Sequence, residues 1–574
     1  MSRVVNRRIR LLLFVLAAAF GALFLRAAWL QAVRAQSLSR LGETQHREEV
    51  TLPASRGTIF DRMGVQLALG EQATTVYADP LQIRNPRAVA GIVGRVLGID
   101  PARLYPRLAD RTHGFVYVER QADPARAAAL ARKHLAGVGF YPEERRGYPQ
   151  AAVAAQLLGY VGVDDKGLAG MEFQLDRQLA GRPGHETVVK DATGRAVDVI
   201  VDRPELQGRD VTLTIDHTIQ ANAEEVLRAT VRKWGAKDAT AVVLDPRTGD
   251  VLAMAVEPGY DANRFPSVSP ELQRNRAVTD TYEPGSTFKL VTVAAALSER
   301  LVSPSTMFTL PYSIQVADRV IHDAEPRGTV RYSVQQILAH SSNVGAITLA
   351  ELLGRERLSR WISRFGFGHR TGIDFPGESG GIVLPLDKWS GSTIGNVPIG
   401  QGIAVTPVQM AAAYAAIANH GVWRQPQLVD RIGGEPRRFP SHRRIVSRAI
   451  ANELMTMLKD VVAEGTGTYA AIPGYEVAGK TGTAQKPDSH GGYATGEYVA
   501  SFVGAVPASR PRLVVLVTVD EPHGAIWGGV VAAPAFQQIA SFDLRYLEIP
   551  PDAPIVATTT AGTDATNTTS ATAP

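Results

Sequence analysis

The chain of 574 residues is longer than one hydrophobic core usually holds, so at least two folded units are expected, and its 45% hydrophobic and 20% charged residues exclude wholesale disorder. Most of the formal net charge of +5 lies in four arginines before residue 11, which excludes a nucleic-acid-binding surface spread over the molecule. The absence of cysteine excludes disulfides, cysteine nucleophiles and thiolate metal sites.

The first predicted element is an apolar segment, residues 11–33, that contains a single charged residue, Arg26. As a helix its 23 residues would span roughly 34 Å, and a bilayer core needs about 30 Å. The arginines within residues 1–10 predict a cytoplasmic N-terminus and a single crossing. A cleaved signal peptide with a small-residue site at residues 33–35 is the competing interpretation, but the segment is longer than a usual signal core.

Residues 34–210 are predicted to form a separate N-terminal domain. Glycines and an aspartate between Ser55 and Ala68 indicate turns between short strands, and helices are predicted over residues 86–96 and 123–134. A polar, strand-like stretch over residues 186–201 closes the region. Its residues form no pattern typical of catalysis, so a structural or partner-docking domain is expected.

From residue 211 the pattern changes. An amphipathic helix is predicted over residues 218–233, a β-hairpin over residues 240–256, and mainly helical segments over residues 286–458. Further strands are predicted over residues 475–484, 498–506 and 512–520. Strands at both ends of a helical middle predict an α+β domain, residues 211–548, whose sheet is built from distant segments.

Two stretches are predicted to carry no fold of their own. Residues 549–574 consist mainly of small and polar residues that bury too little surface to order themselves, which predicts an unfolded tail. A basic cluster in a proline-containing stretch is interpreted as a solvated loop or helix edge; it consists of Arg437, Arg438, Arg443, Arg444 and Arg448.

The first motif with a chemical interpretation is Ser286-Thr287-Phe288-Lys289, which follows Glu-Pro-Gly and opens an apolar, helix-compatible run. Serine and lysine three residues apart in the first turn of a helix lie on one face. A serine hydroxyl needs a base to become a nucleophile, and a partly buried lysine with a lowered pKa can serve. The helix N-terminus adds positive potential where an oxyanion would form. Ser-x-x-Lys alone is common by chance, so the pattern needs support from elsewhere.

The second motif, Ser341-Ser342-Asn343, follows a predicted helix that ends near residues 339–340. Ser341 and Asn343, two residues apart in a loop, can face one cavity. They would supply a proton-relaying hydroxyl and an amide that binds a substrate carbonyl or the lysine. The alternative interpretation is a helix cap.

The third motif, Lys480-Thr481-Gly482-Thr483, lies inside the predicted strand over residues 475–484. Glycine in a strand interior indicates close approach of another backbone, such as a peptide substrate lying antiparallel. Thr481 and Thr483 share a face and are candidates to hold a carboxylate, whereas simple alternation sends Lys480 to the other face. Spacing therefore leaves the reach of Lys480 into the site open.

The three motifs occur in this order within one domain, and this set is typical of penicillin-binding proteins and class A β-lactamases. Over residues 1–548 the chain resembles a class B penicillin-binding protein. Four further stretches carry the resemblance: Arg56 to Gly64 (RGTIFDRMG), Arg146 to Pro149 (RGYP), Gly400 to Pro407 (GQGIAVTP) and Trp527 to Phe536 (WGGVVAAPAF). The chain is most similar to the septal, division-specific transpeptidase of the family, through a short pedestal, a single span with an internal arginine and Gly-Ala-Val-Pro at residues 504–507.

The resemblance implies an α+β fold class with three parts. A penicillin-binding, serine-transpeptidase-like domain, made of a sheet with a helical subdomain, occupies residues 211–548. It is preceded by an elongated pedestal domain of the dimerisation type at residues 34–210, and by one transmembrane helix. The implied location is the bacterial inner (cytoplasmic) membrane, with the catalytic domain in the periplasm.

The resemblance also assigns a role to each catalytic candidate. Ser286 attacks the carbonyl of the penultimate D-alanine of a stem pentapeptide and expels the terminal D-alanine, with Lys289 as general base. Ser341 and Lys480 relay a proton to the leaving amine. The amine of a neighbouring stem then attacks the acyl-enzyme, which cross-links peptidoglycan.

The remaining candidates would hold the substrate. The backbone N–H groups of Ser286 and Thr483 form the oxyanion hole, and Asn343 orients the donor peptide. Thr481 and Thr483, with Gly482 between them, bind its terminal carboxylate. β-Lactams acylate the serine because their strained amide imitates D-alanyl-D-alanine. No metal or organic cofactor is expected.

The implied partners are the stem pentapeptide ending in D-Ala-D-Ala, β-lactams, a membrane-embedded glycan polymerase and other division proteins, but no nucleic acid. Other functions stay open at this point. An elongation-specific transpeptidase differs in its place of action, and a D,D-carboxypeptidase differs only in using water as the acceptor. A β-lactamase or penicillin sensor shares the motifs, although Ser-Ser-Asn replaces Ser-Asp-Asn and no deacylating glutamate is identified. A catalytically idle scaffold would not need intact motifs.

Overall fold

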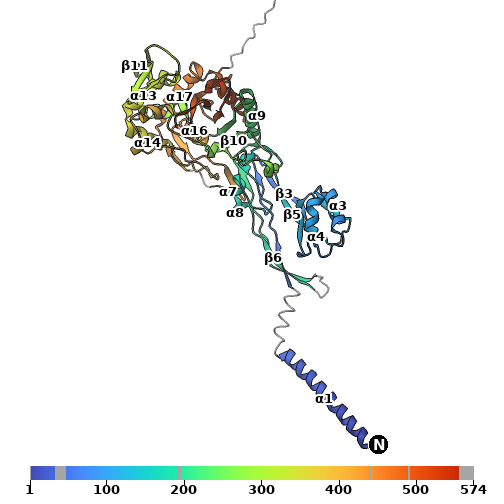
Figure 1. Ribbon diagram of the computed structural model, residues 1–574. Helices are drawn as coiled ribbons and strands as arrows, with labels where there is room; N and C mark the ends of the chain where they lie inside the picture. The colour runs from blue at the N-terminus through green and yellow to red at the C-terminus, as the bar shows by residue number, and fades with distance from the viewer. Residues whose placement is uncertain (1, 33–46, 191–195, 438–440, 489–490, 555–574) are drawn as a thin grey trace, which may run out of the picture. The chain divides into compact units, whose positions relative to one another are not determined.

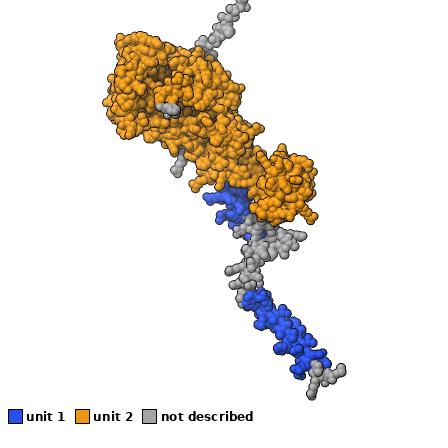
Figure 2. Space-filling view, viewed as in Figure 1, with its two compact units in different colours: residues 1–56, 180–208 blue, residues 57–179, 209–574 orange. Residues whose placement is uncertain are grey.

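The computed structural model describes residues 2–32, 47–190, 196–437, 441–488 and 491–554. These residues form two compact units (Figure 2). The first unit consists of residues 1–56 with 180–208, and the second consists of residues 57–179 with 209–574. The region expected as one N-terminal domain is therefore divided between the two units.

The first unit contains one long helix, α1 (Ser2–Ala32). Within it, Val5–Ala32 contains an 18-residue window with a mean hydropathy of 2.3 that is not buried, so this helix is long and apolar enough to cross a membrane. It is the one such helix among the described residues. The apolar segment predicted over residues 11–33 is thus part of a helix that already begins at residue 2.

The first unit also contains a three-stranded antiparallel sheet. Its strands, in spatial order, are β1 (Arg47–Leu52), β6 (Gly184–Lys190) and β7 (Ala196–Arg203). The stretch over residues 186–201, predicted as one strand-like segment, is therefore two strands. The residues between them, 191–195, lie outside the described part of the chain.

In the second unit, one mixed sheet joins distant parts of the chain. Its spatial order is β17-β16-β8-β2-β3-β4, and β5 also pairs with β3. The strands are β2 (Ile59–Phe60), β3 (Gln66–Ala78), β4 (Val116–Ala122), β5 (Val138–Gly147), β8 (Val211–Leu213), β16 (Val429–Ile432) and β17 (Glu435–Pro436). A small separate core holds the helices α3 (Pro86–Leu97), α4 (Pro101–Ala109) and α5 (Pro124–Ala131) on β3, β4 and β5.

The turn between β2 and β3 explains the sequence RGTIFDRMG. Asp61 is buried, and its Oδ1 accepts hydrogen bonds from the backbone N–H groups of Met63 and Val65, each at 2.8 Å. Its Oδ2 lies 2.7 Å from Nδ1 of His217, at the start of α9 (His217–Trp234). Gly64 has a φ of +87°, which glycine adopts without strain. The motif therefore ties the first strands of this unit to α9.

The central sheet of the second unit has five antiparallel strands in the order β10-β9-β21-β20-β19. They are β9 (Asp238–Leu244), β10 (Val251–Glu257), β19 (Ala478–Pro487), β20 (Tyr493–Val506) and β21 (Leu513–Asp520). The strands predicted at the two ends of the domain therefore meet in one sheet, which confirms the α+β fold class.

Side chains on the two faces of this sheet enter different cores, which is why its inner strands are mainly apolar. Ala241 and Val517 belong to the core on the side of α9 and α19, whereas Val242 and Leu516 belong to the other core. The helices that build these layers are α9 and α19 (Ala533–Tyr546) on one face, and α11 (Lys289–Ser298), α16 (Pro407–Ala418) and α17 (Arg448–Ala463) on the other (Figure 1). The result is a sheet between two helical layers.

Shorter elements complete the second unit. The remaining α-helices are α6 (Ala155–Leu158), α7 (Gly170–Gln174), α8 (Asp176–Leu179), α10 (Arg276–Thr279), α12 (Val334–Ala339), α13 (Asn343–Leu353), α14 (Arg355–Phe365), α15 (Thr393–Asn396) and α18 (Gly528–Val531). The remaining strands form three pairs: β11 (Met307–Leu310) with β14 (Val330–Ser333), β12 (Ser313–Val316) with β13 (Arg319–His322), and β15 (Val422–Arg424) with β18 (His442–Arg444). The 3-10 turns are η1 (Ala262–Ser267), η2 (Gly285–Phe288), η3 (Leu386–Lys388), η4 (Val397–Ile399) and η5 (Thr468–Ala470).

After α19 the chain stays attached to this unit for a few residues. Ile549 is buried, and its carbonyl accepts a hydrogen bond of 2.6 Å from the hydroxyl of Tyr475. The carboxylate of Asp552 accepts another, of 2.8 Å, from the backbone N–H of Glu476. Residues 549–552, expected to belong to an unfolded tail, are therefore packed on this unit, and the rest of the predicted tail, residues 555–574, lies outside the described residues.

Candidate active site

The serine of the first motif lies in the turn η2, which runs directly into α11. Gly285 has a φ of +54°, and a Cβ there would lie 2.8 Å from the carbonyl oxygen of Thr483. Only glycine lets this turn approach the strand so closely. The backbone carbonyl of Thr287 accepts a hydrogen bond of 2.9 Å from the hydroxyl of Tyr414 in α16. Ser286, half-buried, is thus held on a fixed turn against β19.

Lys289 connects this turn to the second motif. Its side chain is buried, and its Nζ donates hydrogen bonds to the backbone carbonyl of Ser341 at 2.5 Å, to Ser341 Oγ at 3.2 Å and to Asn343 Oδ1 at 2.7 Å. Burial lowers the pKa of Lys289 to about 7, and the nearby carboxylate of Asp323 opposes this shift. A large fraction of this lysine is therefore neutral at physiological pH, as a base must be.

The three residues of the second motif make different contacts. Ser342 caps α13: its Oγ accepts a hydrogen bond of 3.0 Å from the backbone N–H of Gly345. Ser341, with a φ of +58°, and Asn343 turn to Lys289 instead. The helix-cap interpretation is thus correct for the middle serine, whereas its two neighbours contact Lys289.

An aspartate that the sequence motifs do not include holds this loop in place. Asp323 is buried, and its carboxylate accepts hydrogen bonds from Ser342 Oγ and the backbone N–H of Val344, each at 3.0 Å. It also pairs with the guanidinium of Arg327. The neighbouring carbonyl of His322 accepts a hydrogen bond of 3.0 Å from Asn343 Nδ2. No spacing rule connects an aspartate this far upstream to the loop, so sequence reasoning missed it.

Lys480 reaches the same site although strand alternation points it away from Thr481. Its side chain is fully buried, and Nζ lies 3.3 Å from Thr481 Oγ1 and 3.4 Å from Thr466 Oγ1. Burial, and next the positive charge of Lys289, lower the pKa of Lys480 well below its usual value. The long side chain therefore brings its amine close enough to Lys289 for the two charges to interact, which spacing alone left open.

The strand of the third motif, β19, is the edge strand of the central sheet. A Cβ at Gly482 would lie 2.8 Å from the carbonyl oxygen of Pro284. The close backbone approach predicted for this glycine is therefore made by the chain's own serine turn. Thr483 Oγ1 accepts a hydrogen bond of 3.0 Å from the backbone N–H of Gly528, at the start of α18. One edge of β19 carries no partner strand among the described residues.

Thr466 is a further site residue that sequence reasoning missed. It lies in the loop after α17, and its Oγ1 is 2.7 Å from Thr481 Oγ1 as well as 3.4 Å from Lys480 Nζ. Its hydroxyl thus links the lysine and the threonine of the third motif. The surrounding Gly-Thr-Gly-Thr is a plain loop signal, which does not distinguish a site residue.

The Gly400-to-Pro407 motif supports the entry to the serine turn. Glu283 Oε1 accepts a hydrogen bond of 2.9 Å from the backbone N–H of Gly402, and its Oε2 accepts one of 3.1 Å from the hydroxyl of Tyr493. Burial raises the pKa of this carboxyl. The backbone N–H of Gly285 donates to the carbonyl of Gly400 at 3.0 Å. The motif is therefore a structural support directly beneath the serine.

The described residues contain one group of carboxylates and histidine close enough to hold a metal ion, namely Asp61, Asp216 and His217. Its oxygens already have donors: Asp61 accepts from the β2–β3 turn, and Asp216 accepts from the backbone N–H groups of Thr218 and Ile219 as the N-cap of α9. The geometry is that of a turn joined to a helix cap. We therefore interpret this group as structural.

Two sequence families match the chain, one over the domain that carries the candidate site and one over the N-terminal region. Residues 239–541 match the family described as penicillin binding protein transpeptidase domain, and residues 51–213 match the penicillin-binding protein dimerisation domain. A serine turn, a lysine with a lowered pKa and an edge strand, carried on a helix–sheet–helix domain, accord with that description. The fold and the site thus define a penicillin-binding transpeptidase.

Individual relatives show to which class of penicillin-binding proteins the chain belongs. The probable peptidoglycan D,D-transpeptidase PenA of Neisseria meningitidis is 34% identical over 96% of this chain and 95% of its own. The peptidoglycan D,D-transpeptidase FtsI of Escherichia coli is 33% identical over 96% of this chain and 94% of its own. The crystal structure of penicillin-binding protein 3 from Mycobacterium tuberculosis, complexed with aztreonam, is 31% identical, covers 88% of this chain and 99% of its own, and has a TM-score of 0.70. The chain belongs to the class B penicillin-binding proteins and is a peptidoglycan D,D-transpeptidase.

Proposed function

We propose that Ser286 is the nucleophile of this transpeptidase and that neutral Lys289 is its general base. The base takes the hydroxyl proton while Oγ bonds to the carbonyl carbon of the penultimate D-alanine, and the terminal D-alanine leaves. One observation carries the assignment: the lysine three residues after the serine is buried, has a pKa of about 7 and is hydrogen-bonded to Ser341 and Asn343.

The groups around this pair take the remaining roles in the proposal. Ser341 and Lys480 relay the proton to the leaving amine, since the hydroxyl contacts Lys289 and the second amine has a strongly lowered pKa. A lowered pKa suits proton transfer at neutral pH. The amine of a second stem then attacks the acyl-enzyme and restores the free serine.

Substrate binding uses the edge strand. The backbone N–H groups of Ser286 and Thr483 form the oxyanion hole, which the close packing of Gly285 on Thr483 supports. Thr481 and Thr483 hold the terminal carboxylate, with Gly482 between them, and Asn343 orients the donor peptide. A stem peptide would lie along the free edge of β19 as an added strand.

Labelled penicillin tests this assignment in the intact protein. We expect one covalent adduct per chain, and fragment masses that locate it on Ser286. A stable adduct together with cross-linked product supports transpeptidation. Fast turnover of a chromogenic cephalosporin would instead indicate a β-lactamase, and release of D-alanine without cross-links would indicate a carboxypeptidase.

We further propose that the enzyme acts at the division septum of a bacterium. α1 would anchor it in the inner membrane with the N-terminus in the cytoplasm and the catalytic domain in the periplasm, because arginines precede the apolar stretch. Partners would be a membrane-embedded glycan polymerase and other division proteins. Depletion in cells is the test: filaments without constrictions support division, whereas rounded cells would support elongation instead.

Replacing Thr466 by alanine should slow acylation by penicillin about tenfold, because Lys480 and Thr481 both lose a hydroxyl contact worth about 1 kcal/mol. The second-order acylation rate constant is the measurement. Thr466→Ser keeps the hydroxyl, so its acylation rate constant should stay near that of the unchanged protein. Thr468→Ala, two residues on and exposed, is the matched control. Equal rates in Thr466→Ala and Thr468→Ala would remove Thr466 from the site.

Asp323→Asn should shift the pH profile of acylation to lower pH. The carboxylate of Asp323 raises the pKa of Lys289, so removing its charge lets that pKa fall and leaves the base neutral at lower pH. The maximal rate should also decrease, because the second-motif loop loses part of its support. Asp318→Asn changes an exposed aspartate of the same region and should leave the profile in place. A profile unmoved by Asp323→Asn would contradict the electrostatic coupling.

A further inference from the structure

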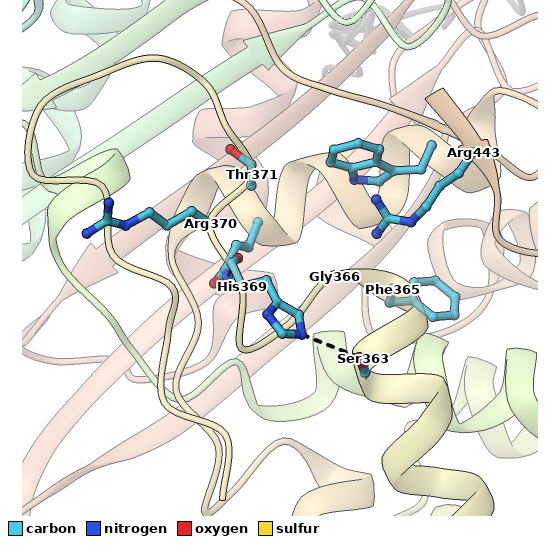
Figure 3. A pocket seen from close by; sticks show the side chains of 9 residues that line it. Ser363, Phe365, Gly366, His369, Arg370, Thr371 and Arg443 are labelled. Carbon is cyan, nitrogen blue, oxygen red and sulfur yellow. Dashed lines mark hydrogen bonds between the residues drawn. The ribbon is translucent and has the colours of Figure 1, made fainter. Parts of the chain in front are cut away.

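A cavity of about 240 Å³ is lined by residues that take no part in the site described above (Figure 3). It is formed by the end of α14, the loop that follows it, Gln409 of α16 and the paired strands β15 and β18. Strand β18 includes part of the basic cluster predicted to be a solvated edge. Pockets for drug-sized ligands run from about 300 to 1,000 Å³, so this cavity suits a smaller group.

The floor of the cavity is apolar and fixed. Phe365 is 2% exposed and Trp423 is 6% exposed. Gln409, also buried, donates hydrogen bonds of 2.8 Å to the carbonyls of His369 and Gly380, so its amide N–H groups are already used. Polar residues line the rest of the cavity, namely Ser363, His369, Arg370, Thr371 and Arg443. An apolar floor with polar groups around it is typical of a small-molecule site.

One cation faces this space without a carboxylate. The guanidinium of Arg443 lies 4.2 Å from the ring centroid of Trp423, its partner across the β15–β18 strand pair, and donates to the carbonyl of Arg364 at 3.3 Å. No ion pair joins Arg443 to an acidic residue within the described ranges. Figure 3 shows this guanidinium turned toward the cavity, whereas that of Arg370 points away. Several donors of Arg443 are therefore free to bind an anion.

Neighbouring residues pack against Arg443 and leave it able to bind an anion. Gly366 has a φ of +99°, and a Cβ there would lie 3.0 Å from Nη2 of Arg443. The buried carboxylate of Glu378 is occupied elsewhere, because it accepts hydrogen bonds from the backbone N–H and hydroxyl of Thr371, each at 2.6 Å. The lining thus offers an incoming ammonium group no free carboxylate.

We propose that this cavity binds the C-terminal carboxylate of a peptidoglycan stem peptide as a second, non-catalytic site. The carboxylate pairs with Arg443, and the methyl groups of the terminal D-alanines lie on Phe365 and Trp423. Free D-alanine is disfavoured because its ammonium, next to the carboxylate, finds no partner. The inference rests on the proposed function, which makes peptides ending in D-Ala-D-Ala the ligand available to this enzyme.

A titration of the full chain in detergent tests the proposal. Ser286 is first blocked with unlabelled penicillin, excess drug is removed, and diacetyl-L-lysyl-D-alanyl-D-alanine is added while binding heat or ligand NMR signals are followed. We expect saturable binding with a dissociation constant in the millimolar range or below. Arg443→Gln should weaken it about tenfold or more, and Ser363→Trp, which fills the cavity and keeps the charge, should do the same.

Controls separate this site from a general anion site and from the active site. Arg360→Gln removes an exposed arginine of α14 and should leave binding unchanged. If inorganic phosphate or free D-alanine bound as tightly as the peptide, and Arg443→Gln abolished that binding, the peptide assignment would be overturned. An absence of saturable peptide binding would also overturn it. The mass of the blocked protein is read on the same sample: if no penicillin is attached to Ser286, the proposed function fails, whatever the titration gives.

Discussion

Replacing Ser286 by alanine should abolish covalent uptake of penicillin and the formation of cross-links. The alanine methyl cannot form the acyl bond, and loss of a catalytic nucleophile typically lowers kcat on the order of a million-fold. The fold should remain intact, because the residue is half-buried on a turn that other contacts hold. The measurement is the second-order rate constant of acylation, followed by the mass of the intact protein.

The matched control for this variant is Ser298→Ala, at the other end of α11. It removes a hydroxyl from the same helix and should acylate at the unchanged rate. Thermal unfolding of both proteins checks that any loss is chemical and not structural. A Ser286→Ala protein that still carried one penicillin per chain would place the nucleophile at another residue, and the roles proposed for Lys289 and Ser341 would have to be abandoned.

Local chemistry explains why much of the fold could be predicted. Apolar runs, turn residues and helix periodicity predict α9, the β9–β10 hairpin and the three later strands. These signals depend only on neighbours in the chain. The meeting of the three motifs followed from their joint occurrence and the family resemblance. Nothing in their spacing required Gly482 to lie against Pro284, a contact between segments almost 200 residues apart.

What sequence reasoning missed depends on tertiary contacts. Asp323 and Thr466 are ordinary residues of a hairpin end and a loop, and they gain roles only because Ser342 and Lys480 are folded onto them. Alternation left the reach of Lys480 open because it describes where a Cβ points, and a four-carbon side chain can return to the other side. The pairing of β1 with β6 likewise joins segments far apart in the chain, which the sequence pattern does not encode.

The rate of acylation should depend on pH with an apparent pKa of about 7. Burial lowers the pKa of Lys289 to about 7, and only the neutral amine accepts the serine proton. Below this value the rate should fall about tenfold per pH unit, and above it the rate should level off. Penicillin acylation measured from pH 5 to 9 is the test. A rate that was flat from pH 5 upward would show that Lys289 is not the titrating base.

Lys289→Met should lower the acylation rate by about a thousand-fold or more, because general-base catalysis alone accelerates a reaction roughly 10²- to 10⁴-fold. The second-motif loop also loses its lysine contacts. The variant should also lack the rise of the rate toward pH 7. Lys388→Met replaces a lysine far along the chain, in the short turn η3, and is the matched control. It should keep both the rate and the profile.

The same substitution makes a second, independent prediction about stability. Between about pH 7 and the ordinary lysine pKa of about 10.4, Lys289 is neutral in the folded protein and protonated in the unfolded chain. The unfolded state therefore binds more protons, so the free energy of unfolding rises with pH across this window by about 1.4 kcal/mol per pH unit for this group. Lys289→Met should remove that contribution from the slope. Because Lys480 is shifted in the same direction, its contribution should remain. Denaturant unfolding of both proteins at pH 7.5 and 9 measures the difference, and identical slopes would mean that the amine is not buried in the neutral form that base catalysis requires.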